Sequence, residues 1–458
     1  MKAPHGPRRP ARIWHTLLDV GYAGASVLAL PYALARLALD RKARARAVPF
    51  VRDLPARFAR RTPRGGEAPC LVVQAVSVGE VKAVAHLLAR LGEALPGVDI
   101  VLAVTTVTGR RVARELYPTL RVERTPADVS WSVGRFLDAL RPDLVLLVES
   151  ELWPGFLMAL RRRSIPVVLV NGRMSERSAR RLGRVRWFAR RLLGALDGAF
   201  VQLPAYGDRF AALGMDPKRI AVTGNIKLDN MAAEPDRERA RHLAHLLGVE
   251  EPDVPVVVAG STHPGEERAL VRAVRRLAGE GRRMRLVLAP RHPERRESVA
   301  ADVRREGGVP VLRSGIEAPR GPAAPDDVFV LDSVGELEAL YGAADFAFVG
   351  GTLVPHGGQN MMEPASLGLP VVVGPHLGNF RSEVALLQAA DAVRVVDDED
   401  GLASVLRAWC DDRAAARAQG SRAQAVVRAS QGAGQRTVEG LEPWLARLRA
   451  PAVSAPAG

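Results

Sequence analysis

From Pro69 onward the sequence alternates short apolar runs with longer amphipathic stretches, and this repeat constrains the fold more than any other feature. Short apolar runs predict buried strands, and amphipathic stretches predict helices that cover a sheet, so their alternation predicts an α/β protein with parallel sheets. The runs form two series separated by a polar helical stretch over 234–247. The predicted strands are 71–75, 100–105, 144–148, 167–170, 198–202 and 220–223 in the first series, and 254–259, 285–289, 309–312, 328–331, 346–350 and 371–374 in the second.

Two such series predict two Rossmann-like domains joined by a short linker. Doubly wound sheets bind ligands at the carboxyl ends of their strands, so we expect the chemistry in a cleft that these ends face. The predicted boundaries are an N-terminal segment at 1–48, a first domain at 49–230, a linker at 231–252, a second domain at 253–450 and a tail at 451–458.

Composition excludes several classes of protein. With 47% hydrophobic and 25% charged residues the chain is an ordinary globular protein rather than a disordered one. Its two cysteines, Cys70 and Cys410, exclude a disulfide scaffold or a Cys-rich metal site and fit a reducing compartment. The formal charge of +15 either indicates an anionic partner or reflects an arginine-rich base composition. No zinc-finger spacing or RNP-like aromatic cluster accompanies it, so we expect no nucleic acid.

The N-terminus predicts a membrane-associated helix. Residues 13–38 are mostly apolar, and the uncharged run at 20–35 is about 16 residues, or roughly 24 Å as a helix, which is marginal for a bilayer core of about 30 Å. Cationic residues flank it on both sides, and no cleavage site stands out. The segment is therefore either a membrane or interface anchor or a helix packed on the protein surface. The arginine-rich stretch 177–191 likewise suits anionic lipid head groups or is a solvated face.

The tetrapeptide Ser-Val-Gly-Glu occurs twice, at 77–80 and 333–336, each time after a predicted strand. Each copy fits a capping box, in which a serine and a glutamate satisfy free N–H groups at the start of a helix. Glu80 and Glu336 are therefore either caps or carboxylates that face the cleft. As a general base, Glu80 would have a pKa lowered by the helix dipole.

Further polar residues follow predicted strands. Glu149 and Glu151 come directly after 144–148, and Lys227 follows 220–223, where it is either a group that neutralises a phosphate or a surface residue. Pro290 and Arg291 follow 285–289, and an arginine is suited to bidentate phosphate binding. Glycines at 350–351 and 357–358 precede a helix that begins near Glu363, where backbone N–H groups favour a phosphate.

In their order along the chain, these motifs closely resemble those of the 3-deoxy-D-manno-octulosonic acid (Kdo) transferases of Gram-negative bacteria. The resemblance covers about residues 71–379. It rests on AVSVGE (75–80), TTVTG (105–109), ESELWP (149–154), NGRMS (171–175), TGNIK (223–227), APRHPER (289–295), FVGGTL (348–353) and GGQNMMEP (357–364).

The resemblance implies a GT-B glycosyltransferase that moves Kdo from CMP-Kdo to a lipid A precursor, lipid IVA, at the cytoplasmic face of the inner membrane. It implies inversion at the anomeric carbon, no metal and no cofactor beyond the donor. Glu80 then matches the proton acceptor, and Glu149 and Lys227 match the pair that stabilises the transition state. The residues that match CMP-contacting segments are Pro290, Arg291, Val334, Gly335, Glu336, Asn360, Met361, Met362 and Glu363.

Three departures from the family pattern stand out. The stretch 106–109 is about two residues shorter than usual, Gly172 replaces an alanine, and Met361-Met362 replaces Pro-Leu. The first departure lies in the predicted acceptor half. The alternative reading is another cell-envelope GT-B glycosyltransferase that uses a different nucleotide sugar.

Overall fold

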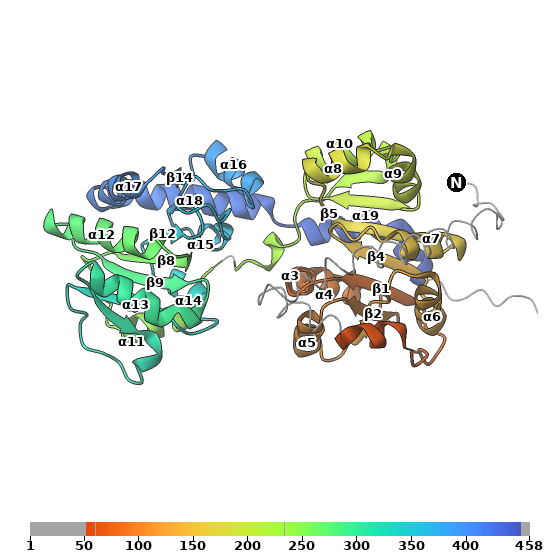
Figure 1. Cartoon of the computed structure of the whole chain (residues 1–458), viewed down its shortest axis with the longest axis horizontal. Coiled ribbons are helices and arrows are strands. Elements are labelled where there is room, and N and C mark those ends of the chain that lie inside the picture. The colour runs from red at the N-terminus through yellow and green to blue at the C-terminus, as the bar shows by residue number, and fades with distance from the viewer. Residues whose placement is uncertain (1–51, 60, 233, 450–458) are drawn as a thin grey trace, which may run out of the picture. The chain divides into compact units, whose positions relative to one another are not determined.

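The computed structural model describes residues 52–59, 61–232 and 234–449, and these divide into two units (Figure 1). The first unit holds the described residues up to Asn230 together with those from Gln431, and the second holds Met231–Ser430. Each unit contains one seven-stranded sheet in which every neighbouring pair is parallel. The predicted α/β class is therefore confirmed.

The sheet of the first unit has the order β3-β2-β1-β4-β5-β6-β7. Its strands are β1 (Cys70–Ala75), β2 (Asp99–Val104), β3 (Arg121–Arg124), β4 (Leu144–Val148), β5 (Val167–Gly172), β6 (Gly198–Val201) and β7 (Ile220–Val222). Its helices are a first one over 52–58, then α3 (Val78–Ala83), α4 (Ala85–Ala94), α5 (Val107–Leu116), α6 (Ser130–Leu140), α7 (Pro154–Arg162), α8 (Glu176–Gly183), α9 (Arg186–Leu193), α10 (Pro204–Ala212), η1 (Pro217–Arg219), η2 (Leu228–Asn230) and α19 (Ala433–Arg449).

The sheet of the second unit has the order β10-β11-β9-β8-β12-β13-β14. Its strands are β8 (Val256–Thr262), β9 (Arg285–Pro290), β10 (Val309–Leu312), β11 (Asp327–Val330), β12 (Phe346–Val349), β13 (Val371–Val373) and β14 (Val393–Val395). Its helices are α11 (Arg237–Leu247), α12 (Glu266–Gly279), η3 (Pro293–Arg295), α13 (Arg296–Arg305), η4 (Arg313–Gly315), α14 (Leu337–Tyr341), α15 (Met362–Ser366), α16 (Arg381–Ala389), α17 (Glu399–Asp411) and α18 (Arg413–Ser430).

Both faces of the first sheet are buried, as unbroken apolar strands predict. Side chains of β1 alternate between two clusters: Leu71 and Val73 pack with α3, α4 and α19, whereas Cys70 and Val72 pack with α6, α7 and α9. Burial raises the pKa of the Cys70 thiol to about 11, so this cysteine is a core residue and not a nucleophile.

The last helix, α19, belongs to the first unit, so the second domain ends earlier than the predicted range of 253–450. Leu441 and Leu445 of α19 are fully buried in the cluster that α4 also lines, and the Trp444 ring meets Phe200 edge-on at 6.5 Å between centroids. The two leucines lie one turn apart, so they form an apolar stripe that the first sheet covers. The predicted linker at 231–252 contains α11, which packs against α14 in the second unit.

All the predicted strands are present, with ends shifted by up to three residues, but β3 and β14 were missed. The sequence of β3 is Arg-Val-Glu-Arg, and all four residues are partly exposed because the strand lies at the edge of its sheet. A charged edge strand carries no apolar run to detect. In the described part of the chain no helix is long and apolar enough to cross a membrane, and the segment predicted to do so, 13–38, lies outside the described residues.

Candidate active site

In the first sheet the strand order reverses between β1 and β4, and Glu80 and Glu149 lie just beyond these two strands. Such a switch point is where α/β sheets bind ligands. The chain after β7 crosses the same strand ends: the N–H of Ile226 donates to Asn171 Oδ1 at 3.1 Å, and Asn230 Nδ2 donates to the carbonyl of Ala83 at 2.9 Å. This crossing brings Lys227 to Glu149.

Glu80 is 8% exposed. The predicted capping box of α3 is present in part: Ser77 Oγ accepts from the N–H of Glu80 at 3.4 Å, but the Glu80 carboxylate binds the N–H of Val76, one residue before the cap, and not that of Ser77. Oε2 accepts from the N–H of Val76 at 2.8 Å, and Oε1 accepts from the Ser77 hydroxyl at 3.0 Å. Burial nevertheless raises the pKa of Glu80, and the charge of Glu149 adds to this effect. The two hydrogen bonds and the charge of Lys227 lower the pKa, but they do not cancel the increase. The expected lowering by the helix dipole is therefore wrong, and a raised pKa makes Glu80 a stronger base.

Glu149 is held in an unusual backbone conformation, with φ of 63°. A non-glycine residue in this left-handed region is strained, and such strain persists where the surrounding structure fixes it. Glu149 Oε1 lies 2.5 Å from Lys227 Nζ, and Oε2 lies 3.9 Å from Arg173. The glutamate side chain is 13% exposed and that of Lys227 is 39% exposed, so the ammonium group faces solvent beside a mostly buried carboxylate.

Two further polar residues complete this group. Asn171, which is fully buried with φ of 54°, accepts from Ile226 and so orients the loop that carries Lys227. Sequence reasoning missed its role, although asparagine is one of the few residues that tolerate this conformation. Glu151 accepts from Trp153 Nε1 at 2.6 Å, and burial raises its pKa, with Glu80 and Glu149 adding to the effect.

In the second sheet the order reverses between β8 and β12, and a buried carboxylate joins the loops after these strands. Glu266 is fully buried and accepts four backbone N–H groups, from His263 after β8 and from the loop after β12 at Gly351, Thr352 and Leu353, at 2.7–3.0 Å. A carboxylate with four backbone donors fixes both loops. Sequence reasoning missed Glu266, which lies in the first turn of α12.

Gly350 is required by this packing rather than by a ligand. A side chain there would place its Cβ 2.4 Å from the carbonyl oxygen of Ser261 and 2.5 Å from Cα of Thr262. Both contacts are with backbone, so only glycine allows the two loops to meet.

Cationic and imidazole groups surround these loops. The rings of His263 and His356 pack together in a tilted arrangement, with 3.8 Å between centroids and 31° between planes. Burial lowers the pKa of His263 to about 4, with His356, Arg295, His292 and Arg291 adding to the effect, so its ring is neutral at pH 7. Gln359 Nε2 then donates to Nε2 of His263 at 3.1 Å, and the proton stays on Nδ1.

Arg291 is exposed beside this group. Its backbone N–H donates to the carbonyl of Thr262 at 3.0 Å, which anchors it at the end of β8. Its guanidinium contacts no protein acceptor among the described residues, so it is available to an anion. Pro290 is the buried last residue of β9 and sets this position.

The second Ser-Val-Gly-Glu copy is not the predicted capping box. Gly335 has φ of 88°, outside the helical region, and α14 begins only after Glu336. The Glu336 carboxylate accepts from Ser333 and from Arg313 Nη2, the latter at 3.0 Å, and the Val334 side chain is 88% exposed. Glu336 is therefore an ion-paired residue, and the exposed groups of this turn are its backbone and Val334.

The segment before α15 presents a carboxylate and an amide. Asn360 Nδ2 donates to Glu363 Oε1 at 3.0 Å, and Asn360 Oδ1 accepts from the N–H of Met362 at 3.2 Å. Asn360 and Glu363 keep exposed atoms, whereas Met361 and Met362 are fully buried. The two methionines thus meet the core with their side chains, and the exposed polar groups of this segment are those of Asn360 and Glu363. Across 52–59, 61–232 and 234–449, no group of three or more His, Cys, Asp or Glu side chains is arranged to hold a metal ion.

Comparison with known proteins identifies relatives over most of the chain. Residues 52–230 match the family 3-deoxy-D-manno-octulosonic-acid transferase (kdotransferase). The chain is 33% identical over 398 residues to a 3-deoxy-D-manno-octulosonic acid transferase of Haemophilus influenzae, which covers 85% of this chain and 92% of that protein. It is also 33% identical over 404 residues to the transferase of that name from Bordetella pertussis, with 85% and 91% covered. Among solved structures, UDP-GlcNAc 2-epimerase from Neisseria meningitidis has a TM-score of 0.57 at 12% identity, covering 82% of this chain and all of that one, which is a likeness of fold.

Proposed function

The chain belongs to the 3-deoxy-D-manno-octulosonic acid (Kdo) transferase family and is a glycosyltransferase, and from this premise we propose that it moves Kdo from CMP-Kdo to the lipid A precursor lipid IVA. The observation that carries the proposal is the buried Glu80 beside the Glu149–Lys227 pair at the switch point of the first sheet. The GT-B arrangement, with two Rossmann-like domains that face a cleft, is part of the proposal.

In the transfer step Glu80 accepts the proton of the acceptor hydroxyl. The hydroxyl oxygen forms a bond to the anomeric carbon of Kdo while the bond from that carbon to the phosphate oxygen breaks, and CMP leaves with the bonding electrons. A single displacement inverts the anomeric centre. Lys227 offsets negative charge on the leaving phosphate, and Glu149 holds the lysine and faces the positive charge that develops on the sugar.

The second unit holds the donor in this proposal. CMP-Kdo is anionic at its phosphodiester and at the Kdo carboxylate, and Arg291 offers a guanidinium with no protein acceptor in the described structure. Asn360 and Glu363 present polar atoms for the ribose hydroxyls, while Pro290, Val334, Gly335, Glu336, Met361 and Met362 shape the surrounding loops. No resident metal or cofactor enters the proposal.

We also place the protein at the cytoplasmic face of the inner membrane. The support is the apolar segment at 13–38 and the exposed arginines of α8 and α9. These arginines are Arg177, Arg180, Arg181, Arg186, Arg190 and Arg191, with Arg184 between the two helices. Val185 and Trp187 lie between them and are 41% and 59% exposed, so cationic and apolar groups share one surface that fits anionic lipid.

The test is incubation with a CMP-Kdo generating system and lipid IVA, with products weighed by mass spectrometry. Products heavier than lipid IVA by one or more Kdo units, formed equally well in excess EDTA, support the proposal. A reaction that stops on chelation and resumes with magnesium contradicts the metal-free mechanism. Greater thermal protection by UDP than by CMP favours the alternative, a transferase with a different nucleotide sugar.

A further inference from the structure

A second cationic site lies in the first unit, outside the residues described above. A cavity of about 340 Å³ is lined by Val107, Arg110, Arg111, Arg114 and Glu115 of α5 and by Arg124 of β3. The five α5 residues occupy positions i, i+3, i+4, i+7 and i+8, so they form one face of the helix. Four arginines thus meet a single glutamate around one cavity.

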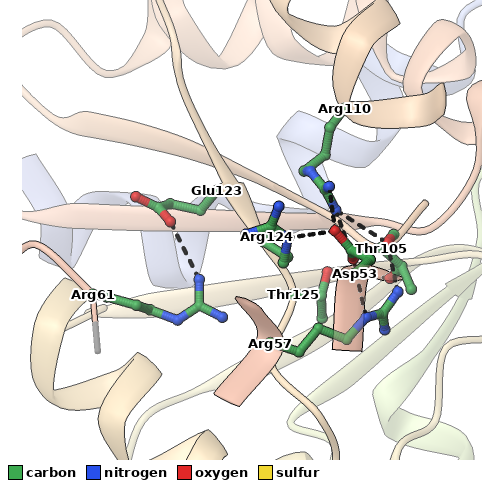
Figure 2. A network of polar contacts seen from close by, with 8 residues as sticks. All are labelled: Asp53, Arg57, Arg61, Thr105, Arg110, Glu123, Arg124 and Thr125. Atoms are coloured by element: carbon green, nitrogen blue, oxygen red, sulfur yellow. Dashed lines mark hydrogen bonds and ion pairs between the residues drawn. The ribbon is translucent and has the colours of Figure 1, made fainter. Parts of the chain in front are cut away.

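A buried aspartate, Asp53 from the helix over 52–58, holds two of these arginines, Arg110 and Arg124, together with Arg57 (Figure 2). The Asp53 side chain is 4% exposed, and its Oδ1 and Oδ2 accept from Arg110 at 2.6 and 3.2 Å. Arg124 Nε lies 2.9 Å from Oδ1, and Arg57 Nε donates to Oδ2 at 3.3 Å. Burial raises the pKa of Asp53, but the hydrogen bond and charge of Arg110 and the charges of Arg124 and Arg57 outweigh it and hold the pKa below its ordinary value. One ionised carboxylate therefore fixes three guanidinium groups and leaves an excess of positive charge.

Several of the guanidinium groups that line the cavity retain free donors. Arg124 approaches Asp53 through Nε, its side chain is 30% exposed, and its two terminal nitrogens have no partner in the described part of the chain. Arg114 is exposed and also has no partner among the described residues. Arg111 Nε lies 3.7 Å from Glu115 Oε1, which is an ion pair but too long for a hydrogen bond. Arginine donors converge in this way where phosphate is bound, because two parallel N–H groups match two phosphate oxygens.

We propose that this cavity binds a phosphate group of the lipid acceptor. The identity of that ligand rests on the proposed function. A cavity of this size accommodates a small organic group and not only a free ion. Two apolar side chains of α5, Val107 and Leu116, are 42% and 49% exposed, which suits a lipid more than inorganic phosphate. In sequence, Asp53 also lies shortly after the predicted membrane segment at 13–38.

The test compares matched arginine variants of the full-length protein in detergent. Arg114→Ala and Arg124→Ala change the cavity, and Arg162→Ala is the control, because Arg114 and Arg162 are both exposed arginines in the last turn of a helix. The KM is measured for lipid IVA and for the same acceptor with one phosphate removed. We expect the two cavity variants to raise the KM for the diphosphorylated acceptor by about tenfold or more, with kcat within about threefold, as the loss of a charge-assisted hydrogen bond predicts. The cavity variants should also lose part of their preference for the acceptor with two phosphates over the acceptor with one. The Arg162→Ala control should keep the KM and kcat of the unmodified protein.

Binding measurements separate the proposal from the proposed function. If no Kdo is transferred at all, binding to vesicles that contain phosphatidic acid still reports on the cavity, and we expect both cavity variants to bind more weakly than Arg162→Ala. Unchanged KM and unchanged vesicle binding in both cavity variants would overturn the proposal. Titration calorimetry with inorganic phosphate tests the remaining possibility. If the cavity variants lose phosphate binding while the KM for the acceptor and the vesicle binding stay constant, the cavity binds a free anion. That result would overturn the assignment to the lipid.

Discussion

Glu149 Oε1 lies 2.5 Å from Lys227 Nζ, although one residue follows β4 in the middle of its sheet and the other follows β7 at the edge. The loop after β7 makes this contact by crossing the strand ends, with Asn171 holding it at Ile226. The Glu149 carboxylate is mostly buried, whereas the Lys227 ammonium group is partly exposed to solvent. This exposure allows the lysine to offset negative charge on a ligand.

We expect Lys227→Ala to lower kcat by about 10²–10³-fold with a smaller change in the KM for CMP-Kdo, because a preorganised charge acts mainly in the transition state. Steady-state kinetics with Lys218→Ala as the control measure this. Lys218 is an exposed lysine of η1 in the same unit. If both variants retain similar kcat, Lys227 is a surface residue.

We expect Glu80→Gln to lower the rate of Kdo transfer by about 10²–10⁴-fold, because an amide cannot accept the hydroxyl proton. CMP should still protect this variant from thermal unfolding. In the unmodified protein the acid limb of kcat/KM should lie above the ordinary glutamate value of 4.5, because burial raises the pKa of Glu80 and activity requires its ionised form. Transfer within a few-fold of the unmodified enzyme would leave Glu80 with its capping-box role alone.

Arg291→Ala and Glu363→Ala should weaken binding of CMP-Kdo by about 10–150-fold, the loss that a charge-assisted hydrogen bond predicts. Calorimetric titration with the donor tests this. The control is Arg304→Ala, an exposed arginine of α13 whose side chain forms no hydrogen bond or ion pair with another described residue. Equal affinities in all three variants would remove these residues from the donor site.

The stability of the second unit should rise with pH between about 4 and 6.5. His263 has a pKa of about 4 in the folded state against an ordinary 6.5, so the unfolded chain binds more protons in this window and acid favours unfolding. At about 1.4 kcal/mol for each pKa unit, the shift of His263 from 6.5 to about 4 contributes at most about 3.5 kcal/mol. Melting temperatures measured from pH 4 to 7 should show a shallower slope in His263→Gln, and an identical slope would show that other groups titrate in this range.

Deletion of residues 1–48 should leave a folded protein that binds anionic vesicles at low salt and releases them near roughly 0.5 M salt, where the Debye length falls to roughly 4 Å. The full-length protein should resist that wash, because burial of apolar surface is not screened by ions. Co-sedimentation measures both. Release of the full-length protein by salt would show that residues 13–38 are not an anchor. A truncated protein that ignores the vesicles at low salt would show that the arginines of α8 and α9 form only a solvated face.

The sequence by itself determined the features that depend on local spacing. Apolar runs located the strands within a few residues, because a buried parallel strand needs an unbroken apolar segment. Ser77 and Glu80, three positions apart, specified the cap of α3 in the same way. The order of the strand-end motifs identified the family, because each motif is a short continuous segment.

Only the tertiary structure decided which distant groups meet. The second Ser-Val-Gly-Glu copy fails as a cap because Gly335 takes a left-handed conformation and Arg313 binds Glu336. The four N–H groups on Glu266, the return of α19 to the first unit and the assembly of Arg110 and Arg124 around Asp53 all join segments far apart in the chain. Periodicity reports which face of an element is buried, but not which side chain of another element it meets there. That choice is made by strand order and loop path, so the pairing of charges, and with it the raised pKa of Glu80, is a property of the folded chain.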